Sequence, residues 1–298
     1  MSSRSLSVIV PLYRQLRWLR EALSSVQRDG FEDWEALLVD DGSPVDPHPA
    51  IAPFLNDGRF RYVATPHGGI AAARNMGLQQ ARGRWTAFLD QDDRSLPNRF
   101  QRQIAVGEAE GDRVAIVYSD YERIDEHGRV IDRYISRAVP HDRLVRACLS
   151  DRGPVALGTA LCRTEWLRRV GGFDPELSGF DECDLFVRLA LAGAVFGYLP
   201  GVVHQWRRHG DNTMRSPEFQ AARLRFVAKL TRLAETDPRL RAVLRAFEAR
   251  SWYAVGLDHA ERGSWRDARR WCWKAWRRRP ALGSALYLAL KAWLADRR

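Results

Sequence analysis

Three carboxylates follow directly on an apolar, strand-like run of the chain. The run is Trp85–Leu89, and the residues after it are Asp90, Gln91, Asp92 and Asp93. Acids packed this closely repel one another unless a cation neutralises them, and a divalent metal prefers such hard oxygen ligands. Acids at the end of a buried strand also lie where open α/β sheets bind their ligands. The pattern indicates a metal site that can hold a phosphate; the plain alternative is a polar turn.

A second strand-like run, Glu35–Val39, also ends in acids, Asp40 and Asp41. In a parallel sheet both groups of acids open on the same edge, so they could share one ligand. One group could accept hydrogen bonds from a base or ribose while the other holds metal. Arg74, in the helical segment between them, could pair with Asp40 or meet a phosphate. Its plain alternative is an arginine on a helix surface.

An alternating framework of strands and helices would bring these acids together. Such alternation predicts a mostly parallel sheet flanked by helices. The expected strands are Leu6–Val10, Glu35–Val39, Phe60–Val63, Trp85–Leu89, Val114–Tyr118 and Val195–Leu199. The expected helices are Leu16–Val26, Ile70–Gln80, Pro97–Val106 and Cys183–Ala192. The less regular segment 123–154 is expected to carry loops over the site.

Length and composition fit one large domain with a smaller appendage. The chain has 298 residues, of which 45% are hydrophobic, which is enough for a sizeable core. We find no secretory signal at the N-terminus and no apolar run long enough to span a bilayer. The four cysteines lie far apart and form no C-x-x-C pair. This spacing argues against a zinc site and fits a reducing cytoplasm.

The C-terminal part is helical in pattern and strongly basic. Of the net charge of +10, most lies in residues 262–298, which hold eleven Lys or Arg and two acids. Tryptophans are interleaved with these arginines at positions 265, 271, 273, 276 and 293. This combination suits contact with an anionic membrane surface. The alternative is a helical hairpin with tryptophans packed inward and arginines outward. Nucleic acid is not expected, because no recognised binding motif accompanies the charge.

Four segments, in this order and spacing, resemble the family 2 glycosyltransferases. They are Val8–Tyr13, Val39–Ser43, Gly69–Gly77 and Phe88–Asp93, and the resemblance covers about residues 5–212. It implies the GT-A fold, an α/β, Rossmann-like, mostly parallel central sheet flanked by helices. Here a C-terminal all-helical extension follows. The expected domains are a nucleotide-sugar-binding and catalytic domain at 1–212 and a basic, Trp-rich helical extension at 213–298.

The resemblance also implies where the donor binds. Pro11 and Tyr13 would flank the nucleobase. Asp40 would contact the base, commonly uracil, and Arg74 would support the base site or a phosphate. The donor is expected to be a nucleoside-diphosphate sugar, with UDP as the expected nucleotide.

A DxD-type motif falls on the three acids that follow the strand-like run Trp85–Leu89. By the resemblance Asp92 contacts the ribose and also belongs to the metal site, Asp93 is the leading ligand of Mn²⁺ or Mg²⁺, and Asp90 lies in or behind the metal site. A divalent cation between the two phosphates would stabilise the charge that builds on the leaving oxygen. In the segment Trp206–His209, Arg207 would meet phosphate and His209 phosphate or metal. The plain alternative for His209 is a solvated loop histidine.

The acceptor hydroxyl must lose a proton as it attacks, so a carboxylate base is needed. Family members read Glu-Asp-x-Asp-Leu where this chain has Asp181-Glu182-Cys183-Asp184-Leu185. Position by position the base falls on Glu182, with Asp181 as the competitor because the pair is reversed. The plain alternative is an acidic cluster that stabilises the N-terminus of the following helix.

The sequence therefore predicts a metal-dependent inverting glycosyltransferase whose acceptor is a glycan or a lipid-linked saccharide. Its expected place is cytoplasmic, peripheral on the inner membrane face. A haloacid dehalogenase-type phosphatase fits poorly, because the three lysines all lie in the C-terminal helical region. A Rossmann dehydrogenase lacks its G-x-G-x-x-G. The remaining alternative is a degenerate transferase that acts as a membrane-associated scaffold.

Overall fold

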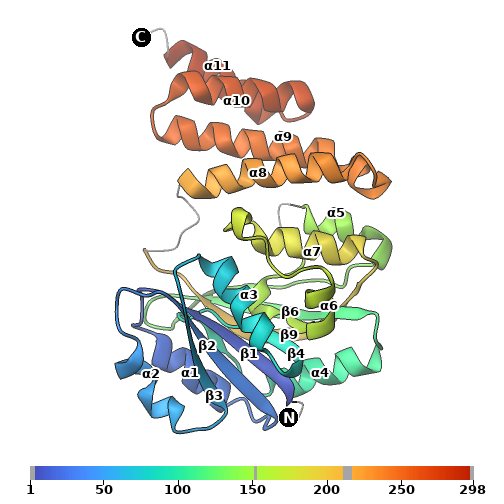
Figure 1. The fold of residues 1–298 in the computed structure, drawn as a ribbon. Coiled ribbons are helices and arrows are strands. Elements are labelled where there is room, and N and C mark those ends of the chain that lie inside the picture. Colours follow the sequence, from blue (N-terminus) through green and yellow to red (C-terminus); the bar gives the residue numbers. More distant parts are fainter. Residues whose placement is uncertain (1–3, 151–152, 211–216, 296–298) are drawn as a thin grey trace. The chain divides into compact units, whose positions relative to one another are not determined.

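The structure is a computed structural model that describes residues 4–150, 153–210 and 217–295. The chain divides into two compact units (Figure 1). The sheet unit comprises Met1–Cys148 and Arg152–Asn212, and the helical unit comprises Leu149–Asp151 and Thr213–Arg298. None of the helices described is both long and apolar enough to cross a membrane.

The sheet unit is built on one nine-stranded sheet. Its strands are β1 (Arg4–Leu12), β2 (Trp34–Asp41), β3 (Phe60–Thr65), β4 (Gly83–Phe88), β5 (Arg94–Ser95), β6 (Val114–Ile124), β7 (Val130–Tyr134), β8 (Leu161–Arg163) and β9 (Val195–Arg207). Their order across the sheet is β3-β2-β1-β4-β8-β6-β9-β5, and β7 pairs with β6.

The predicted alternation of strands and helices is confirmed, and the sheet is mixed. Strands β3, β2, β1 and β4 are parallel neighbours, as are β6 and β9. Between these two groups lies β8, which is antiparallel to both β4 and β6. The sequence did not predict β8 or β5, because strands of three and two residues are too short to show an alternating pattern. It also did not predict β7, which lies in the segment 123–154 that was expected to carry loops.

Helices flank this sheet, as predicted. They are α1 (Leu19–Gln27), α2 (His48–Leu55), α3 (Ile70–Gln80), α4 (Arg99–Ala109), α5 (Leu144–Cys148), α6 (Thr164–Arg169) and α7 (Asp181–Leu191). The sequence predicted α1, α3, α4 and α7, but not α2, α5 or α6. Short 3-10 turns are η1 (His141–Arg143), η2 (Leu157–Thr159) and η3 (Pro175–Leu177). Helix α4 begins later than its proline suggested, because Asn98 adopts a left-handed φ of 60° that a helix cannot continue.

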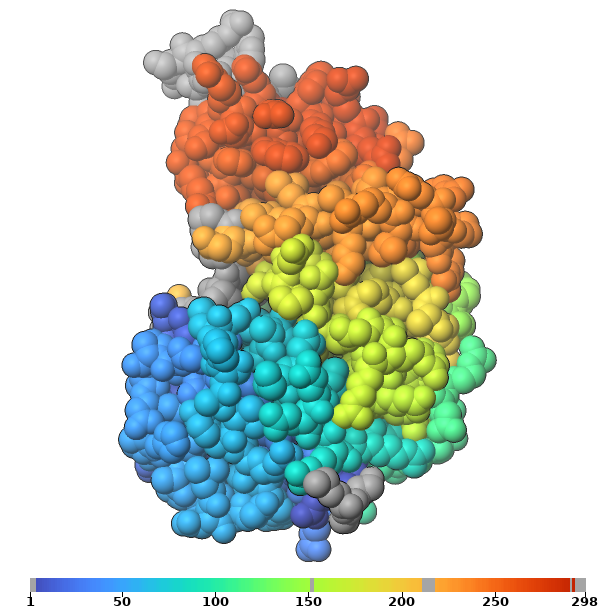
Figure 2. Space-filling model, in the orientation of Figure 1, coloured from blue at the N-terminus to red at the C-terminus, as the bar shows by residue number. Residues whose placement is uncertain are grey.

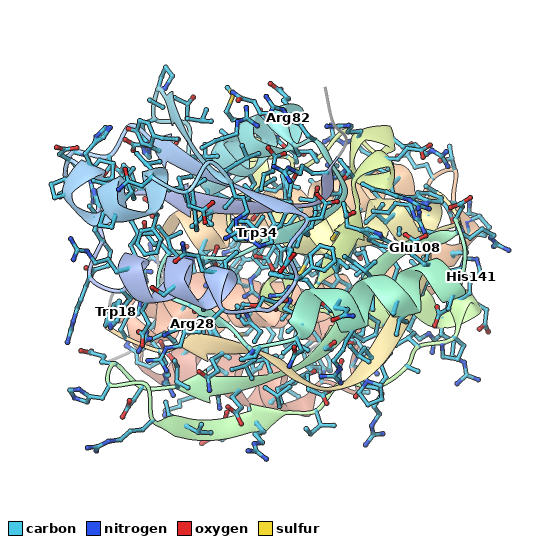
Figure 3. The ribbon with its side chains drawn as sticks, turned by 90° about the horizontal axis from the view of Figure 1, so that it is seen from below. Trp18, Arg28, Trp34, Arg82, Glu108 and His141 are labelled. Carbon is cyan, nitrogen blue, oxygen red and sulfur yellow. The ribbon has the colours of Figure 1, made fainter. Side chains whose placement is uncertain are left out.

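The core of the sheet unit lies against the central strands. Every residue of β2 is buried, including Trp34 at its start, which is labelled in Figure 3. The Trp34 ring packs edge-on against the ring of Phe60 in β3, with centroids 5.2 Å apart. Helix α3 lies very close to β1, because a Cβ at Gly77 would stand 2.5 Å from Cγ2 of Ile9. This close approach fixes the distance between the sheet and α3, which carries Arg74.

The helical unit contains the helices that the C-terminal pattern predicts. They are α8 (Pro217–Leu233), α9 (Pro238–Glu261), α10 (Trp265–Arg278) and α11 (Gly283–Ala295). Small residues, not tryptophans, form the buried face of α10: Ala268, Cys272 and Ala275. Gly256 of α9 permits this packing, since a Cβ there would stand 2.4 Å from Sγ of Cys272.

Candidate active site

Both groups of acids lie at one edge of the sheet. Strand β1 lies between β2 and β4 and is parallel to both, so the carboxyl ends of the three strands meet there. Asp40 lies opposite Leu12 at the end of β2, and Asp90 follows the end of β4. This is the edge at which open α/β sheets bind ligands.

Asp40 is a buried carboxylate held in place by two donors. Its Oδ1 accepts a hydrogen bond from the backbone N–H of Ser43 at 2.8 Å, and its Oδ2 accepts one from the hydroxyl of Tyr62 at 2.6 Å. Burial, together with the charge of Asp40, raises the pKa of Tyr62 to about 12, so this hydroxyl keeps its proton. Pro11, buried in β1, lies opposite Val39, one residue before Asp40.

Tyr13 is fixed next to Asp40 by its backbone and by its ring. The side chain of Gln91 accepts a hydrogen bond from the Tyr13 N–H at 3.0 Å and donates one to the Tyr13 carbonyl at 2.8 Å. The tyrosine ring stacks on His67, with centroids 4.4 Å apart and planes 9° apart. His67 is in turn held by Asp41, 2.8 Å from its Nδ1. An aromatic surface thus stands at the end of β1, where the nucleobase was predicted.

Arg74 brings three carboxylates together beside this edge. Its Nη1 lies 3.0 Å from Oδ2 of Asp181 and 3.2 Å from Oε1 of Glu182, and its Nη2 lies 3.2 Å from Oδ1 of Asp90. Arg74 therefore pairs with these acids, and no bond to Asp40 accompanies them. Burial acts to lower the pKa of Arg74, but the three charges outweigh it and raise the pKa above its ordinary value. We call Arg74, Asp90, Asp181 and Glu182 the arginine cluster.

The segment before α7 is bound to α3, which places the two acids of α7 next to Arg74. Asn75 donates from Nδ2 to the carbonyl of Phe173 at 2.8 Å, and its Oδ1 accepts from the Phe173 N–H at 2.8 Å. In Figure 2 the cyan surface of α3 accordingly borders the yellow-green surface of the chain that leads into α7. Because α7 begins at Asp181, both acids lie in its first turn, where a helix stabilises negative charge.

The two candidate bases differ in access to solvent. The side chain of Asp181 is 2% exposed, and its oxygens accept hydrogen bonds from Arg74 and from the N–H of Gly179. The side chain of Glu182 is 36% exposed, and its ion pair in the cluster is with Arg74. Burial by the surrounding protein, then the charges of Asp181 and Asp90, raise the pKa of Glu182 to about 7, although Arg74 opposes them. Glu182 is thus partly accessible and can change protonation near neutral pH.

Asp92 and His209 form a contact next to the cluster. Nε2 of His209 lies 2.7 Å from Oδ2 of Asp92, and the ring of Trp18 lies 4.9 Å from the His209 ring. Burial and the charge of Asp90 raise the pKa of Asp92, and His209 opposes them. Asp92 keeps 19% of its side chain exposed, so it can still reach a ligand.

Asp93, which was predicted to be the leading metal ligand, faces the interior. Its side chain is 3% exposed; Oδ1 accepts from the Arg207 N–H at 2.8 Å, and Oδ2 lies 2.9 Å from Nε2 of His204. Burial and the charges of Asp92 and Asp90 raise the pKa of Asp93 well above its ordinary value. Burial also lowers the pKa of His204. A neutral His204 that carries its proton on Nε2 can donate to Asp93.

Arg207, which was predicted to meet phosphate, bonds to other groups of the protein. Its Nε donates to the Asp92 carbonyl at 2.8 Å, and Nη1 donates to the carbonyls of Asp125 and Glu126 at 3.1 and 3.3 Å. Its Nη2 lies 2.5 Å from Oε2 of Glu21. The side chain is 1% exposed. Arg207 thus holds the loop after β4 against α1 and against the loop after β6.

Replacing Arg207 by methionine is expected to lower the free energy of unfolding by about 2–4 kcal/mol, because three backbone carbonyls and the carboxylate of Glu21 would lose the buried guanidinium that donates to them. Urea denaturation measures this change. Arg208→Met is the matched control: Arg208 is the exposed neighbour, and its loss is expected to change stability by less than about 0.5 kcal/mol. Equal effects of the two substitutions would show that the buried bonds of Arg207 contribute little.

Sequence reasoning missed Tyr62 and His67, which contact Asp40 and Tyr13, and it missed Gln91 and His204. Gln91 is the variable residue of the acidic motif, yet its amide holds the Tyr13 backbone. His204 is a lone histidine in an apolar strand, and it pairs with Asp93. For His204 a signal existed, since a polar residue in a buried strand requires a partner. For Gln91 the sequence offers no such signal.

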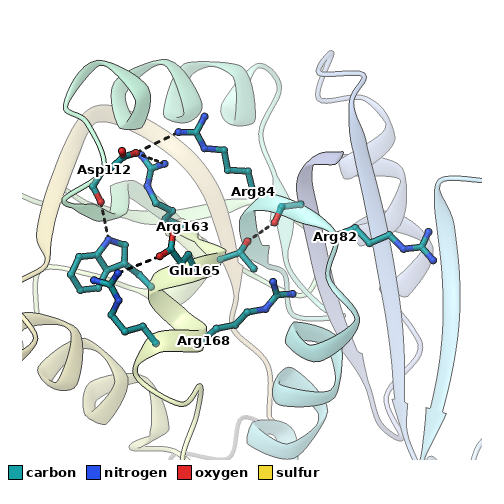
Figure 4. A pocket seen from close by; sticks show the side chains of 10 residues that line it. Arg82, Arg84, Asp112, Arg163, Glu165 and Arg168 are labelled. Carbon is teal, nitrogen blue, oxygen red and sulfur yellow. Dashed lines mark hydrogen bonds and ion pairs between the residues drawn. The ribbon is translucent and has the colours of Figure 1, made fainter. Parts of the chain in front are cut away.

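A cavity of about 550 Å³ lies at the opposite end of β4 from these acids, beside Gly83 (Figure 4). Arginines line much of it, but protein groups occupy the donors of Arg163 and Arg168. Arg163 donates to the carbonyls of Val114, Gly107 and Gly111, and Arg168 donates to two carbonyls near the end of α3. We therefore assign the chemistry to the acidic edge and not to this cavity.

Comparison with known proteins identifies the family of the chain. The family model "Glycosyl transferase family 2" matches residues 7–171. Among curated relatives, the Escherichia coli UDP-Glc:alpha-D-GlcNAc-diphosphoundecaprenol beta-1,3-glucosyltransferase WfgD is 27% identical over 150 residues, which cover 50% of this chain and 58% of WfgD. The chain spans only 29–35% of the length of the first curated relatives it matches.

Two solved structures share the fold over nearly the whole chain. S. aureus TarS 1-349 in complex with UDP-GlcNAc has a TM-score of 0.67 at 18% identity, over 97% of this chain and 89% of that one. Mannosyltransferase PcManGT from Pyrobaculum calidifontis in complex with GDP-Man and Mn²⁺ has a TM-score of 0.58 at 20% identity, over 99% and 81%. The fold is thus GT-A, as predicted, and with more than half of the sequence matched by its model the chain belongs to glycosyltransferase family 2.

Proposed function

We propose that the chain is an inverting glycosyltransferase that moves a sugar from a nucleoside diphosphate to an acceptor hydroxyl. The observation that carries the proposal is Glu182, a partly exposed carboxylate at the ligand edge whose pKa is raised to about 7. A general base works best when its pKa lies near the working pH. Glu182 would take the acceptor proton, the acceptor oxygen would bond to the anomeric carbon, and the diphosphate would leave with the electrons of the broken bond.

Arg74 and Asp181 support that base in this proposal. Both are buried, and the pair fixes the first turn of α7 against α3. We assign catalysis to Glu182 and a positioning role to Asp181, because the oxygens of Asp181 are already occupied by Arg74 and Gly179. The reversed acid pair still presents one accessible carboxylate, so the degenerate scaffold gains no support.

We place the nucleotide at the ends of β1 and β2. Asp40, whose oxygens are held by Ser43 and Tyr62, is an acceptor for an N–H of a nucleobase. Pro11 and the stacked pair of Tyr13 and His67 provide the surface beside it. UDP is the proposed nucleotide, in line with the UDP-linked donors named for WfgD and for the TarS complex.

A divalent cation, Mn²⁺ or Mg²⁺, fits part of the predicted ligand set. Asp90 is 39% exposed and Asp92 19% exposed, and Asp92 contacts His209. Three clustered acids with raised pKa values at Asp92 and Asp93 favour a nearby positive charge. Within the described residues no three His, Cys, Asp or Glu side chains stand ready as an ion site. We propose Asp90, Asp92 and His209 as ligands and give Asp93 the task of holding their loop.

When bound, such a cation would stabilise the negative charge of the leaving diphosphate. Asp92→Asn is expected to weaken Mn²⁺ binding at least tenfold, measured by electron paramagnetic resonance of free Mn²⁺ without any substrate. Asp112→Asn is the matched control, because Asp112 is 90% exposed beside the distant cavity. Unchanged Mn²⁺ affinity of Asp92→Asn would remove Asp92 from the ligand set.

We propose a glycan or a lipid-linked saccharide as the acceptor, and a cytoplasmic place on the inner membrane face. The support is WfgD, whose name gives a diphosphoundecaprenol-linked acceptor. The function is tested by incubating the purified chain with a panel of nucleotide sugars and Mn²⁺, and by measuring release of free nucleotide. Stimulated release with one donor is the expected result. If no donor shifts the melting temperature and none is turned over, the proposal is wrong.

A further inference from the structure

The solvent-facing side of α10 carries a continuous row of cations with one tryptophan. Arg266, Arg270, Trp273 and Arg277 are all exposed, and Trp273 keeps 44% of its surface in solvent. Their spacing of four, three and four residues places them within an arc of about 60° on the helix. No acid of α10 lies in this row, since Asp267, its only acid, falls on another part of the helix. We call these four residues the α10 stripe.

The cations of the stripe are available, in contrast to other basic residues of the same unit. Arg278 is paired with Glu248, Arg262 with Asp258, and Lys274 lies 4.1 Å above the ring of Trp252. Arg266, Arg270 and Arg277 make no ion pair with any residue in the described part of the chain. Their charge is therefore not neutralised by any acid in the described part of the helical unit.

The tryptophan of the stripe is already ordered for contact. Its ring lies 4.9 Å from that of Trp276, tilted by 34°, so a half-buried neighbour supports the exposed ring. Burying an indole that is already held requires little further ordering. A row of arginines around an exposed tryptophan matches an interface of anionic headgroups over acyl chains.

We infer that the α10 stripe is a docking surface for an anionic lipid bilayer. Each arginine near such a surface contributes about 1 kcal/mol of attraction, and Trp273 adds apolar contact at headgroup depth. The predicted alternative, a hairpin with its tryptophans packed inward, describes Trp265, Trp271 and Trp276, which are half-buried, but not Trp273, which is exposed. The fully buried face of α10 is made of Ala268, Cys272 and Ala275. The inference concerns the helical unit and holds whichever sugar the sheet unit transfers.

Vesicle flotation of the full chain tests this surface. We expect binding to phosphatidylcholine vesicles that contain 30% phosphatidylglycerol, loss of binding in 0.5 M NaCl, and no binding to pure phosphatidylcholine. Replacing Arg266, Arg270 and Arg277 together by glutamine is expected to weaken binding on the order of 100-fold. Trp273→Ala is expected to weaken it about fivefold. Circular dichroism verifies that each variant keeps its helices.

The control variant removes the same charge elsewhere. Arg28, Arg82 and Arg232 are exposed, and their joint replacement by glutamine is expected to reduce binding by less than about threefold, through net charge alone. Equal loss in the two triple variants would overturn the inference, as would equal binding to neutral vesicles. The stripe would be assigned to nucleic acid instead if the stripe variant lost binding to a duplex DNA probe and kept its binding to vesicles.

Discussion

Glu182→Gln is expected to reduce sugar transfer by about 10²–10⁴-fold, the range that a general base contributes. The amide keeps the size of the side chain but cannot take the acceptor proton. Donor affinity is expected to stay within about twofold, because the proposed nucleotide contacts lie at Asp40 in β2 and at Tyr13 just after β1, and not on α7. The measurement is transfer rate and donor binding on the same preparation.

The pH dependence of the wild type checks the same residue. Glu182 can accept a proton only when ionised, and its pKa is raised to about 7. Transfer per unit of enzyme and substrate is therefore expected to fall about tenfold for each pH unit below 7 and to level off above it. A profile that is flat from pH 5.5 to 8, or full activity of Glu182→Gln, would exclude Glu182 as the base.

Stability separates this effect from misfolding. A carboxyl whose pKa is raised in the folded state favours folding when protonated, and this contribution is lost as pH rises through 7. At pH 8 the ionised Glu182 therefore opposes folding, and Glu182→Gln is expected to melt no lower than the wild type. Asp181→Asn is the comparison, because Asp181 is 2% exposed and bonded to Arg74. We expect it to lose both stability and activity.

The framework and the location of the site could be predicted from sequence patterns. Buried parallel strands such as β2 read as continuous apolar runs, and their ends are marked by acids such as Asp40 and Asp90. Parallel pairing then places these acids on one edge, as the register of β1 with β2 and β4 confirms. The hydrophobic periodicity predicts the strands and helices, and their alternation predicts the parallel pairing that brings the acids to one edge.

The direction in which each polar side chain points could not be predicted. Asp92 and Asp93 are sequence neighbours, yet Asp92 contacts His209 and stays partly exposed, while Asp93 turns inward to His204. The difference depends on the register of β9, which lies more than a hundred residues away in the chain. Arg207 is a similar case, since its partners come from the loops after β4 and β6 and from α1. Such partners are set by tertiary packing and leave no periodic signal.

Arg74→Met is expected to lower the free energy of unfolding by about 3–5 kcal/mol at pH 8, the loss typical of removing one partner of a buried ion pair. Asp181 would keep only the N–H of Gly179 as a donor, and Asp90 and Glu182 would repel it without compensation. Urea denaturation from pH 5 to 8 measures the change.

The dependence of that loss on pH identifies its cause. Without Arg74 the cluster acids would have raised pKa values in the folded state, so they would favour folding when protonated and oppose it when ionised. The gap between Arg74→Met and the wild type is therefore expected to widen as pH rises from 5 to 8. A gap that stays constant would point to lost packing of the side chain instead of lost charge.

A double-mutant cycle isolates the pair itself. Combining Arg74→Met with Asp181→Asn removes the cation together with the most buried of its acids, so the double variant is expected to be less destabilised than the sum of the two single variants. Arg74→Lys keeps the charge but has no planar fork to reach three carboxylates, and an intermediate stability is expected. If the two single changes are strictly additive, Arg74 and Asp181 have no interaction energy. The ion pair with Arg74 would then not explain why Asp181 is buried next to Glu182.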